Sequence, residues 1–180
     1  MRKTTLMILS ALFAALTALG AFLRIPTFGS AFTLQILFTG MAGCLLGRRW
    51  GAASQIIYVL LGLAGLPIFT GGSGLGALVY PTGGFLIGMI AMAWICGLVV
   101  EKRGSSFRTI CLACGAGLAA LYLIGLPWMH LIMTVYHKDW TLTTTLVSGM
   151  LIFLPWDLLK IVVTALLCAR LRPVIHHTSL

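Results

Sequence analysis

Asp157 and Lys160 are the residues of this chain whose types and spacing point most directly to chemistry. They lie three positions apart within 149–171, a segment that is otherwise long and apolar enough to cross a bilayer. Residues at positions i and i+3 share one face of a helix, and each charge at the centre of a membrane helix costs roughly 2.5 to 3.5 kcal/mol on insertion scales. The pair therefore indicates either a polar ligand site or an ion pair that joins two helices.

The rest of the chain is predominantly apolar. Of its 180 residues, 60% are hydrophobic and only 8% are charged, whereas about a quarter of the residues are charged in soluble globular proteins. This composition predicts an all-α integral membrane protein that forms a single domain over residues 1–180. Apolar runs long enough, or nearly long enough, to cross a bilayer predict six transmembrane helices, at residues 6–23, 32–46, 52–66, 85–100, 110–133 and 147–171.

The basic residues predict the orientation of these helices. Nine Lys and Arg fall at the N-terminus, in alternate connections and at the C-terminus, against two, Arg24 and Lys138, in the opposite loops. Cytoplasmic loops carry the excess of basic residues in membrane proteins, so both termini are expected in the cytoplasm, and the chain in the plasma or inner membrane. The dispersed charges argue against nucleic-acid binding, because no folded basic domain is present to hold a duplex.

The connection at 65–84 is the longest unusual stretch, and it is predicted on the outer side. Its seven glycines and two prolines disfavour a helix, yet it is too apolar to be a solvated linker. Irregular apolar backbone is tolerated beside a bilayer where it packs over protein or lines a cavity. The stretch is therefore predicted to cap the space around Asp157 and Lys160. The further candidate ligand contacts are Gln35, Phe69, Gly71, Gly72, Tyr80 and Thr82.

Small residues recur at helical spacing in the first span, at Ala11, Ala14, Ala15 and Ala18. Faces of this kind permit close helix contact. The spacing equally favours packing inside the bundle and docking of a separate membrane protein. No Gly-x-x-x-x-Gly-Lys-Ser/Thr run occurs, which argues against ATP hydrolysis by this chain.

The cysteines are interpreted as structural. Cys111 and Cys114 form a C-x-x-C pair, but they lie in an apolar stretch near the cytoplasmic side, where thiols stay reduced, and no second pair completes a zinc site. Cys44, Cys96 and Cys168 are interpreted as packing residues. No metal and no cofactor is therefore predicted.

Several motifs stand out along the chain: Gly-Leu-Pro-Ile-Phe at 65–69 with Gly-Gly at 71–72, Pro-Thr-Gly-Gly-Phe at 81–85, and residues within 11–15, 24–26, 33–35, 46–52 and 155–160. Together they resemble the BioY family, the biotin-specific substrate-binding subunits (S components) of energy-coupling factor (ECF) transporters. The resemblance implies a membrane protein that captures biotin from outside and delivers it inward with a transmembrane coupling protein and two cytosolic ATPases. It implies that Asp157 and Lys160 help to hold biotin and that Ala11 and Ala15 dock on the coupling protein.

The chemistry of biotin agrees with this resemblance. An ionised Asp157 only accepts hydrogen bonds and suits the two ureido N–H groups, whereas Lys160 supplies donors for the ureido carbonyl or for the valerate carboxylate. ATP is used by the partner subunits only. The expected partners are biotin, the coupling protein, the ATPases and membrane lipid.

Other classes of function stay open. A stand-alone secondary transporter would use Asp157 to carry a proton, and would depend on a pH gradient without any ATPase. An S component for another vitamin would share the fold but differ in pocket shape. An intramembrane enzyme would need a nucleophile and a base on facing helices, and the sequence offers only Asp157 and the cysteines, so no enzyme is predicted.

Overall fold

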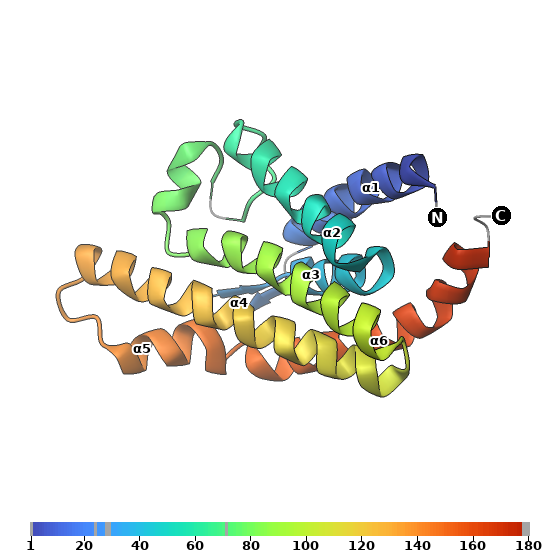
Figure 1. Cartoon of the computed structure of the whole chain (residues 1–180). Coiled ribbons are helices and arrows are strands. Elements are labelled where there is room, and N and C mark those ends of the chain that lie inside the picture. The colour runs from blue at the N-terminus through green and yellow to red at the C-terminus, as the bar shows by residue number, and fades with distance from the viewer. Residues whose placement is uncertain (1, 24, 28–29, 71, 178–180) are drawn as a thin grey trace.

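The computed structural model describes residues 2–23, 25–27, 30–70 and 72–177. As the apolar composition predicts, the described chain is mainly helical, and the helices pack together in one bundle (Figure 1). The long helices are α1 (Lys3–Phe22), α2 (Gln35–Leu63), α3 (Gly83–Arg103), α4 (Phe107–Tyr136) and α6 (Leu154–His177). The short elements are strands β1 (Ile25–Thr27) and β2 (Ser30–Phe32), the 3₁₀ helix η1 (Leu75–Val79), helix α5 (Leu142–Leu146) and the π-helical turn η2 (Val147–Leu151).

Helix α3 is central to the packing. It lies between α2 and α4, while α1 packs on α2 and α6 contacts both α2 and α4 (Figure 1). Glycines allow the close approaches: a Cβ atom on Gly43 would overlap the carbonyl of Ala93, and one on Gly88 would lie 3.0 Å from the carbonyl oxygen of Leu121. Small residues at helix contacts are the usual means of packing helices within a membrane.

Four helical segments are long and apolar enough to cross a membrane, counted over the described residues. They are Lys3–Phe22, Gly83–Arg103, Phe107–Tyr136 and Leu142–Pro173. They coincide with the first, fourth, fifth and sixth predicted spans, and the last begins earlier because α5 and η2 continue into α6. The helical class is thus confirmed, whereas six crossings remain a prediction.

The second and third predicted spans form the two arms of α2, residues 35–46 and 48–63. The arms meet at Gly47, whose φ of 81° is accessible mainly to glycine. The Glu101 carboxylate accepts a hydrogen bond from the Arg48 backbone N–H at 2.9 Å and pairs with the Arg48 guanidinium at 3.3 Å. At 1.5 Å per residue the arms are about 18 and 24 Å long, shorter than the roughly 30 Å of a bilayer core.

Two local features differ from the expectations. The stretch at 65–84 was predicted to contain no helix, but Leu75–Val79 form the 3₁₀ helix η1, where four of the five residues are not glycine. In addition, β1 and β2 pair as a short antiparallel ribbon, with Ile25 opposite Phe32. Pro26 lies in this ribbon, which is compatible with proline because a two-stranded ribbon consists only of edge strands.

Candidate functional site

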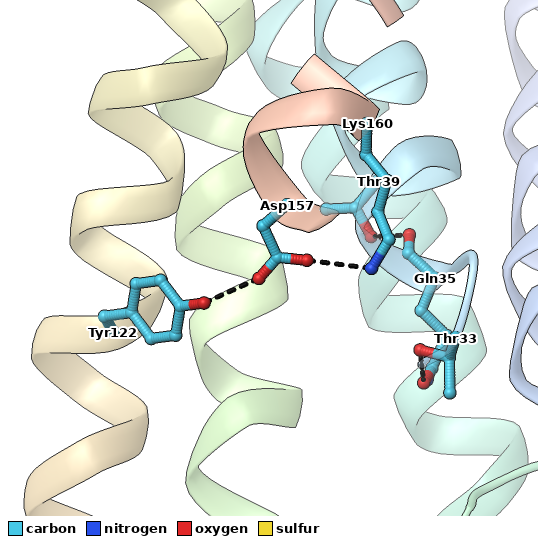
Figure 2. Close-up of polar contacts among 6 residues, drawn as sticks. All are labelled: Thr33, Gln35, Thr39, Tyr122, Asp157 and Lys160. Atoms are coloured by element: carbon cyan, nitrogen blue, oxygen red, sulfur yellow. Dashed lines mark hydrogen bonds and ion pairs between the residues drawn. The ribbon is translucent and has the colours of Figure 1, made fainter. Parts of the chain in front are cut away.

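The two charges of α6 meet a tyrosine of α4. One Asp157 carboxylate oxygen accepts a hydrogen bond from the Lys160 ammonium at 2.8 Å, and the other accepts from the Tyr122 hydroxyl at 2.6 Å (Figure 2). Asp157 is 1% exposed and Lys160 9% exposed. A buried charge is tolerated when it is paired and hydrogen-bonded, so the three side chains form a satisfied unit.

The start of α6 explains the position of Asp157. The π-helical turn η2 ends just before α6, and Pro155 occupies the first turn of α6, where a missing backbone N–H costs least. Asp157 also lies in this first turn, and its backbone N–H donates to the carbonyl of Phe153 at 2.9 Å. Lys160 follows three residues later on the same helix face.

Asp157 and Lys160 line a cavity of about 300 Å³. This volume lies at the lower end of the range of roughly 300 to 1,000 Å³ for small-molecule sites. The walls are mainly apolar and include Phe69, Phe85 and Met89, and a few polar groups converge on the same space, which is the usual composition of a ligand pocket. The polar lining residues other than the ion pair and Tyr122 are Thr33, Gln35, Thr70, Thr82 and Ser148.

Gln35 reaches the cavity from the first turn of α2. Its amide oxygen accepts a hydrogen bond from Thr33 at 3.0 Å, and its amide nitrogen donates to the Tyr58 hydroxyl at 2.8 Å. Tyr58 in turn donates to the carbonyl of Ile68 at 3.0 Å. In Figure 2, Tyr122 lies on one side of the ion pair, and Thr33 and Gln35 lie on the other. An amide has two donors and two acceptor sites, so Gln35 keeps one of each for a ligand.

The segment between α2 and α3 closes part of the cavity wall. Phe69 is buried, its ring packs edge-on against Tyr58 with centroids 5.4 Å apart, and it lines the cavity together with Ala77 and Thr82. The indole N–H of Trp128 on α4 donates to the carbonyl of Leu78 at 3.1 Å and so fastens η1 to the bundle. The predicted cap thus contributes to the cavity, whereas its placement outside the membrane stays a prediction.

The structure brings together five of the eight predicted contacts. Asp157, Lys160, Gln35, Phe69 and Thr82 all line the cavity.

The other three candidates are placed differently. Tyr80 is 52% exposed and does not line the cavity. Gly72 also lies outside the lining and packs near the Tyr80 ring. Gly71 lies outside the described residues.

Sequence reasoning missed the residue that holds the Asp157 carboxylate from the opposite helix. Tyr122 stands alone as a tyrosine within the predicted span at 110–133. A hydroxyl buried in a membrane helix needs a hydrogen-bond partner, so its isolation was a usable signal. Thr33 and Thr70 were also missed, because a threonine beside a loop carries no distinctive pattern.

The small residues of α1 divide between two faces. Ala14 is buried on the face that packs against α2, as Ser10 and Thr17 are. Ala18 is half-buried, while Ala11 and Ala15 are exposed. The structure therefore leaves Ala11 and Ala15, but not Ala14, open to a second protein.

Fold and site together define a class of protein. In the part of the chain that the structure describes, four helices are long and apolar enough to span a membrane, and a buried ion pair borders a cavity. This combination defines a multi-pass membrane protein with a cavity suited to a small molecule. The chain belongs to the BioY family, whose family model matches residues 1–177. The resemblance found in the loop motifs is thus confirmed.

The similarity of this chain to known biotin transporters extends over most of the length of each protein. The biotin transporter BioY of Thermotoga maritima is 37% identical over 168 residues, covering 92% of this chain and 95% of the relative. The biotin transporter BioY of Rhodobacter capsulatus is 38% identical over 182 residues, covering 90% and 92%. A crystal structure of the S-component for biotin from an ECF-type ABC transporter matches with a TM-score of 0.81 and 26% identity, covering 95% and 92%. These relatives are transport proteins, so the prediction that the chain is not an enzyme is confirmed.

Proposed function

We propose that this chain is the biotin-binding S component of an ECF-type importer. Family membership and the structural match support this class of function. The observation that carries it is the Asp157 carboxylate, which is buried beside a largely apolar cavity of about 300 Å³. Biotin presents two ureido N–H donors on an apolar bicycle, and a carboxylate that only accepts hydrogen bonds suits such donors.

The contacts of Asp157 leave room for the ligand. A carboxylate offers about four lone-pair sites, of which Lys160 and Tyr122 occupy two. Lys160 donates one of its three N–H groups to Asp157, so two donors remain for the ureido carbonyl or for the valerate carboxylate. Phe69, Phe85 and Met89 supply apolar surface for the bicycle.

Titration calorimetry tests the ligand. The purified full chain in detergent, freed of co-purified ligand, is titrated in parallel with biotin, thiamine and riboflavin. We expect tight binding of one biotin per chain and no heat from the other two vitamins. Binding of thiamine or riboflavin in place of biotin would assign the chain to another vitamin. Absence of binding by a folded sample would overturn the proposal.

Biotin methyl ester identifies the group that Lys160 contacts. The ester keeps the ureido ring and removes the charge of the valerate carboxylate. If Lys160 binds that carboxylate, the ester loses affinity on the order of tenfold or more, because hydrogen bonds to charged groups contribute about 1.5–3 kcal/mol. If Lys160 binds the ureido carbonyl, the ester binds nearly as well as biotin.

The topology proposed for this function has six crossings with both termini in the cytoplasm. Nine of the basic residues then lie on the cytoplasmic side, as positive-inside bias requires. The two arms of α2 form the second and third crossings despite their short length. Cysteine labelling from one side of the membrane, after single cysteines are placed at exposed loop positions, tests this arrangement.

Delivery of biotin requires partners, namely a membrane coupling protein and two cytosolic ATPases. The exposed stripe of Ala11 and Ala15 on α1 supports docking there. Ala15→Trp is expected to leave biotin binding unchanged and to abolish uptake by the complete transporter. Leu123→Trp, on the 76% exposed surface of α4, is the control and should retain uptake. Loss of binding in Ala15→Trp would mean that this face is internal.

No specific observation favours the alternative function of a stand-alone, proton-coupled secondary transporter. Protonation of Asp157 would leave the Lys160 ammonium buried without its charge partner, which is costly.

A further inference from the structure

Three thiols from three different helices meet inside the bundle, away from the residues that line the cavity. They are Cys44 on α2, Cys96 on α3 and Cys114 on α4, and their Sγ atoms all lie within 4.8 Å of one another. The Sγ atoms of Cys44 and Cys114 are 3.9 Å apart. Each of the three residues is at most 2% exposed. Cys111, the other half of the C-x-x-C pair, is not part of this cluster.

The separations fit a metal ion bound to three sulfurs. With metal–sulfur distances near 2.3 Å, three sulfurs placed evenly around one ion lie about 4.0 Å from one another, which is close to the spacing observed for Cys44 and Cys114. A disulfide would instead need one pair at about 2.05 Å and would exclude the third thiol.

Backbone of two helices packs directly against the thiols. A Cβ atom on Gly117 would lie 2.8 Å from the Cys96 sulfur, and one on Gly40 would lie 3.4 Å from the Cys114 sulfur. At Gly117 the backbone therefore approaches the Cys96 sulfur more closely than a side chain would allow, whereas the contact at Gly40 is an ordinary van der Waals contact. The Cys168 thiol of α6 also interacts with that of Cys44, which adds a fourth helix beside the cluster.

We propose that Cys44, Cys96 and Cys114 form a binding site for one soft monovalent cation, Cu(I). Thiolate sulfur selects soft ions. Structural zinc usually takes four ligands, and Cys168 is not among the three thiols whose Sγ atoms all lie within 4.8 Å of one another. Among the described residues, this cluster holds sulfur ligands only. The ligand of a metal ion is the thiolate and not the thiol, so each coordinating thiol is expected to release its proton to solvent as the ion binds. The positive charge of Cu(I) offsets part of the thiolate charge, and the oxidation state of copper does not change.

Binding of Cu(I) to the three cysteines would connect α2, α3 and α4 through one ion. These helices also supply Gln35, Phe85 and Tyr122 to the cavity, but the three cysteines do not line it. We therefore expect the ion to stabilise the bundle without being required for ligand binding. The cluster lies toward the end of the bundle that carries Gly47, Arg103 and Phe107, which is the cytoplasmic end in the proposed topology.

The test uses the reduced full chain in detergent under anaerobic conditions. Cu(I) is titrated in competition with a chromophoric Cu(I) chelator, and retained copper and released protons are measured. We expect one copper per chain, release of the protons of the coordinating thiols, and a higher melting temperature of the loaded protein. Cys44→Ser, Cys96→Ser and Cys114→Ser should each weaken Cu(I) binding at least tenfold and remove the shift in melting temperature.

Cys111→Ser is the matched control, because it removes a thiol from the same helix as Cys114 but outside the cluster. It should retain copper like the unmodified chain. Monodisperse elution and an unchanged circular dichroism spectrum of the apo variants establish that each is folded. The proposal is overturned if the folded, reduced chain retains no copper, or if the triple serine variant of the cluster retains as much as the unmodified chain. Neither result bears on biotin binding, which is measured separately.

Discussion

Gln35 and Gln55 are two buried glutamines on the two arms of α2, and they use the same side chain in different ways. The Gln55 amide nitrogen donates to Thr17 at 3.2 Å and to Ser54 at 3.1 Å, and its oxygen accepts from Thr39 at 3.1 Å. Both of its donors are therefore used within the protein. Gln55 joins α1 to α2 and does not line the cavity.

Gln35 makes fewer bonds and lies at the cavity. It donates once, to Tyr58, and accepts once, from Thr33. We therefore expect a buried polar group to contact a ligand only where it keeps unused donors or acceptors and borders open space. Asp157 meets the same two conditions.

The largest loss of affinity is expected from Asp157→Asn, which keeps the size of the side chain and removes its charge. Biotin affinity should fall at least about 100-fold, because two N–H bonds to a charged acceptor contribute roughly 1.5–3 kcal/mol each. The change is measured by calorimetry on purified protein, with expression level and melting temperature as measures of folding. If the variant fails to fold while any folded fraction binds biotin normally, the ion pair is structural.

Gln35→Leu tests the cavity-side glutamine. It should weaken biotin binding by about tenfold, because the hydrogen bond expected between Gln35 and biotin is lost. The Tyr58 hydroxyl, which fixes the neighbouring segment, also no longer accepts a hydrogen bond from residue 35. The melting temperature should fall only modestly. Competition binding with a labelled biotin measures the affinity. An unchanged affinity would place Gln35 in the same structural category as Gln55.

Tyr122→Phe removes one hydrogen bond to the Asp157 carboxylate and leaves the ring in place. A net hydrogen bond contributes about 1 kcal/mol, so affinity should fall about threefold to fivefold. The rate of biotin release should rise by a similar factor, because the carboxylate is held less firmly. A loss as large as that of Asp157→Asn would mean that Tyr122 contacts biotin directly and does not only position the carboxylate.

Charge in an apolar run was the most informative feature of the sequence. The position of Asp157 and Lys160 at the cavity was predictable, because a charged residue inside a membrane helix usually faces a partner, a cavity or a ligand. The division of α2 at Gly47 was predictable from the Gly and Arg residues that interrupt its apolar run. The helical class and four of the six predicted spans also followed from apolar length alone. These signals are local in sequence, so a single chain reveals them.

Contacts between distant segments could not be predicted in the same way. The meeting of Tyr122 with Asp157 depends on how α4 and α6 pack, and the convergence of Cys44, Cys96 and Cys114 depends on three helices at once. Spacing along the chain revealed only the C-x-x-C pair within one helix, which was interpreted as structural, and gave no sign of the cluster that the packing creates. Tyr80 was predicted at the ligand because of its type, but the path of the segment before α3 leaves it half exposed.

Gln55→Leu should have the smallest effect on affinity and a large effect on stability. The substitution leaves Thr17, Ser54 and Thr39 without their common partner in the contact between α1 and α2. Buried groups that lose a partner cost about 1–3 kcal/mol, so we expect the free energy of unfolding to fall by about 2 kcal/mol or more and the melting temperature to fall with it. Calorimetry on the folded fraction should give an unchanged biotin affinity, because Gln55 does not line the cavity. Gln35→Leu, measured in parallel, is the matched control, because the two substitutions are chemically identical. We expect affinity to fall only in Gln35→Leu and stability to fall more in Gln55→Leu. That result would establish that spare hydrogen-bonding capacity beside open space, and not burial, distinguishes a ligand contact from a structural residue.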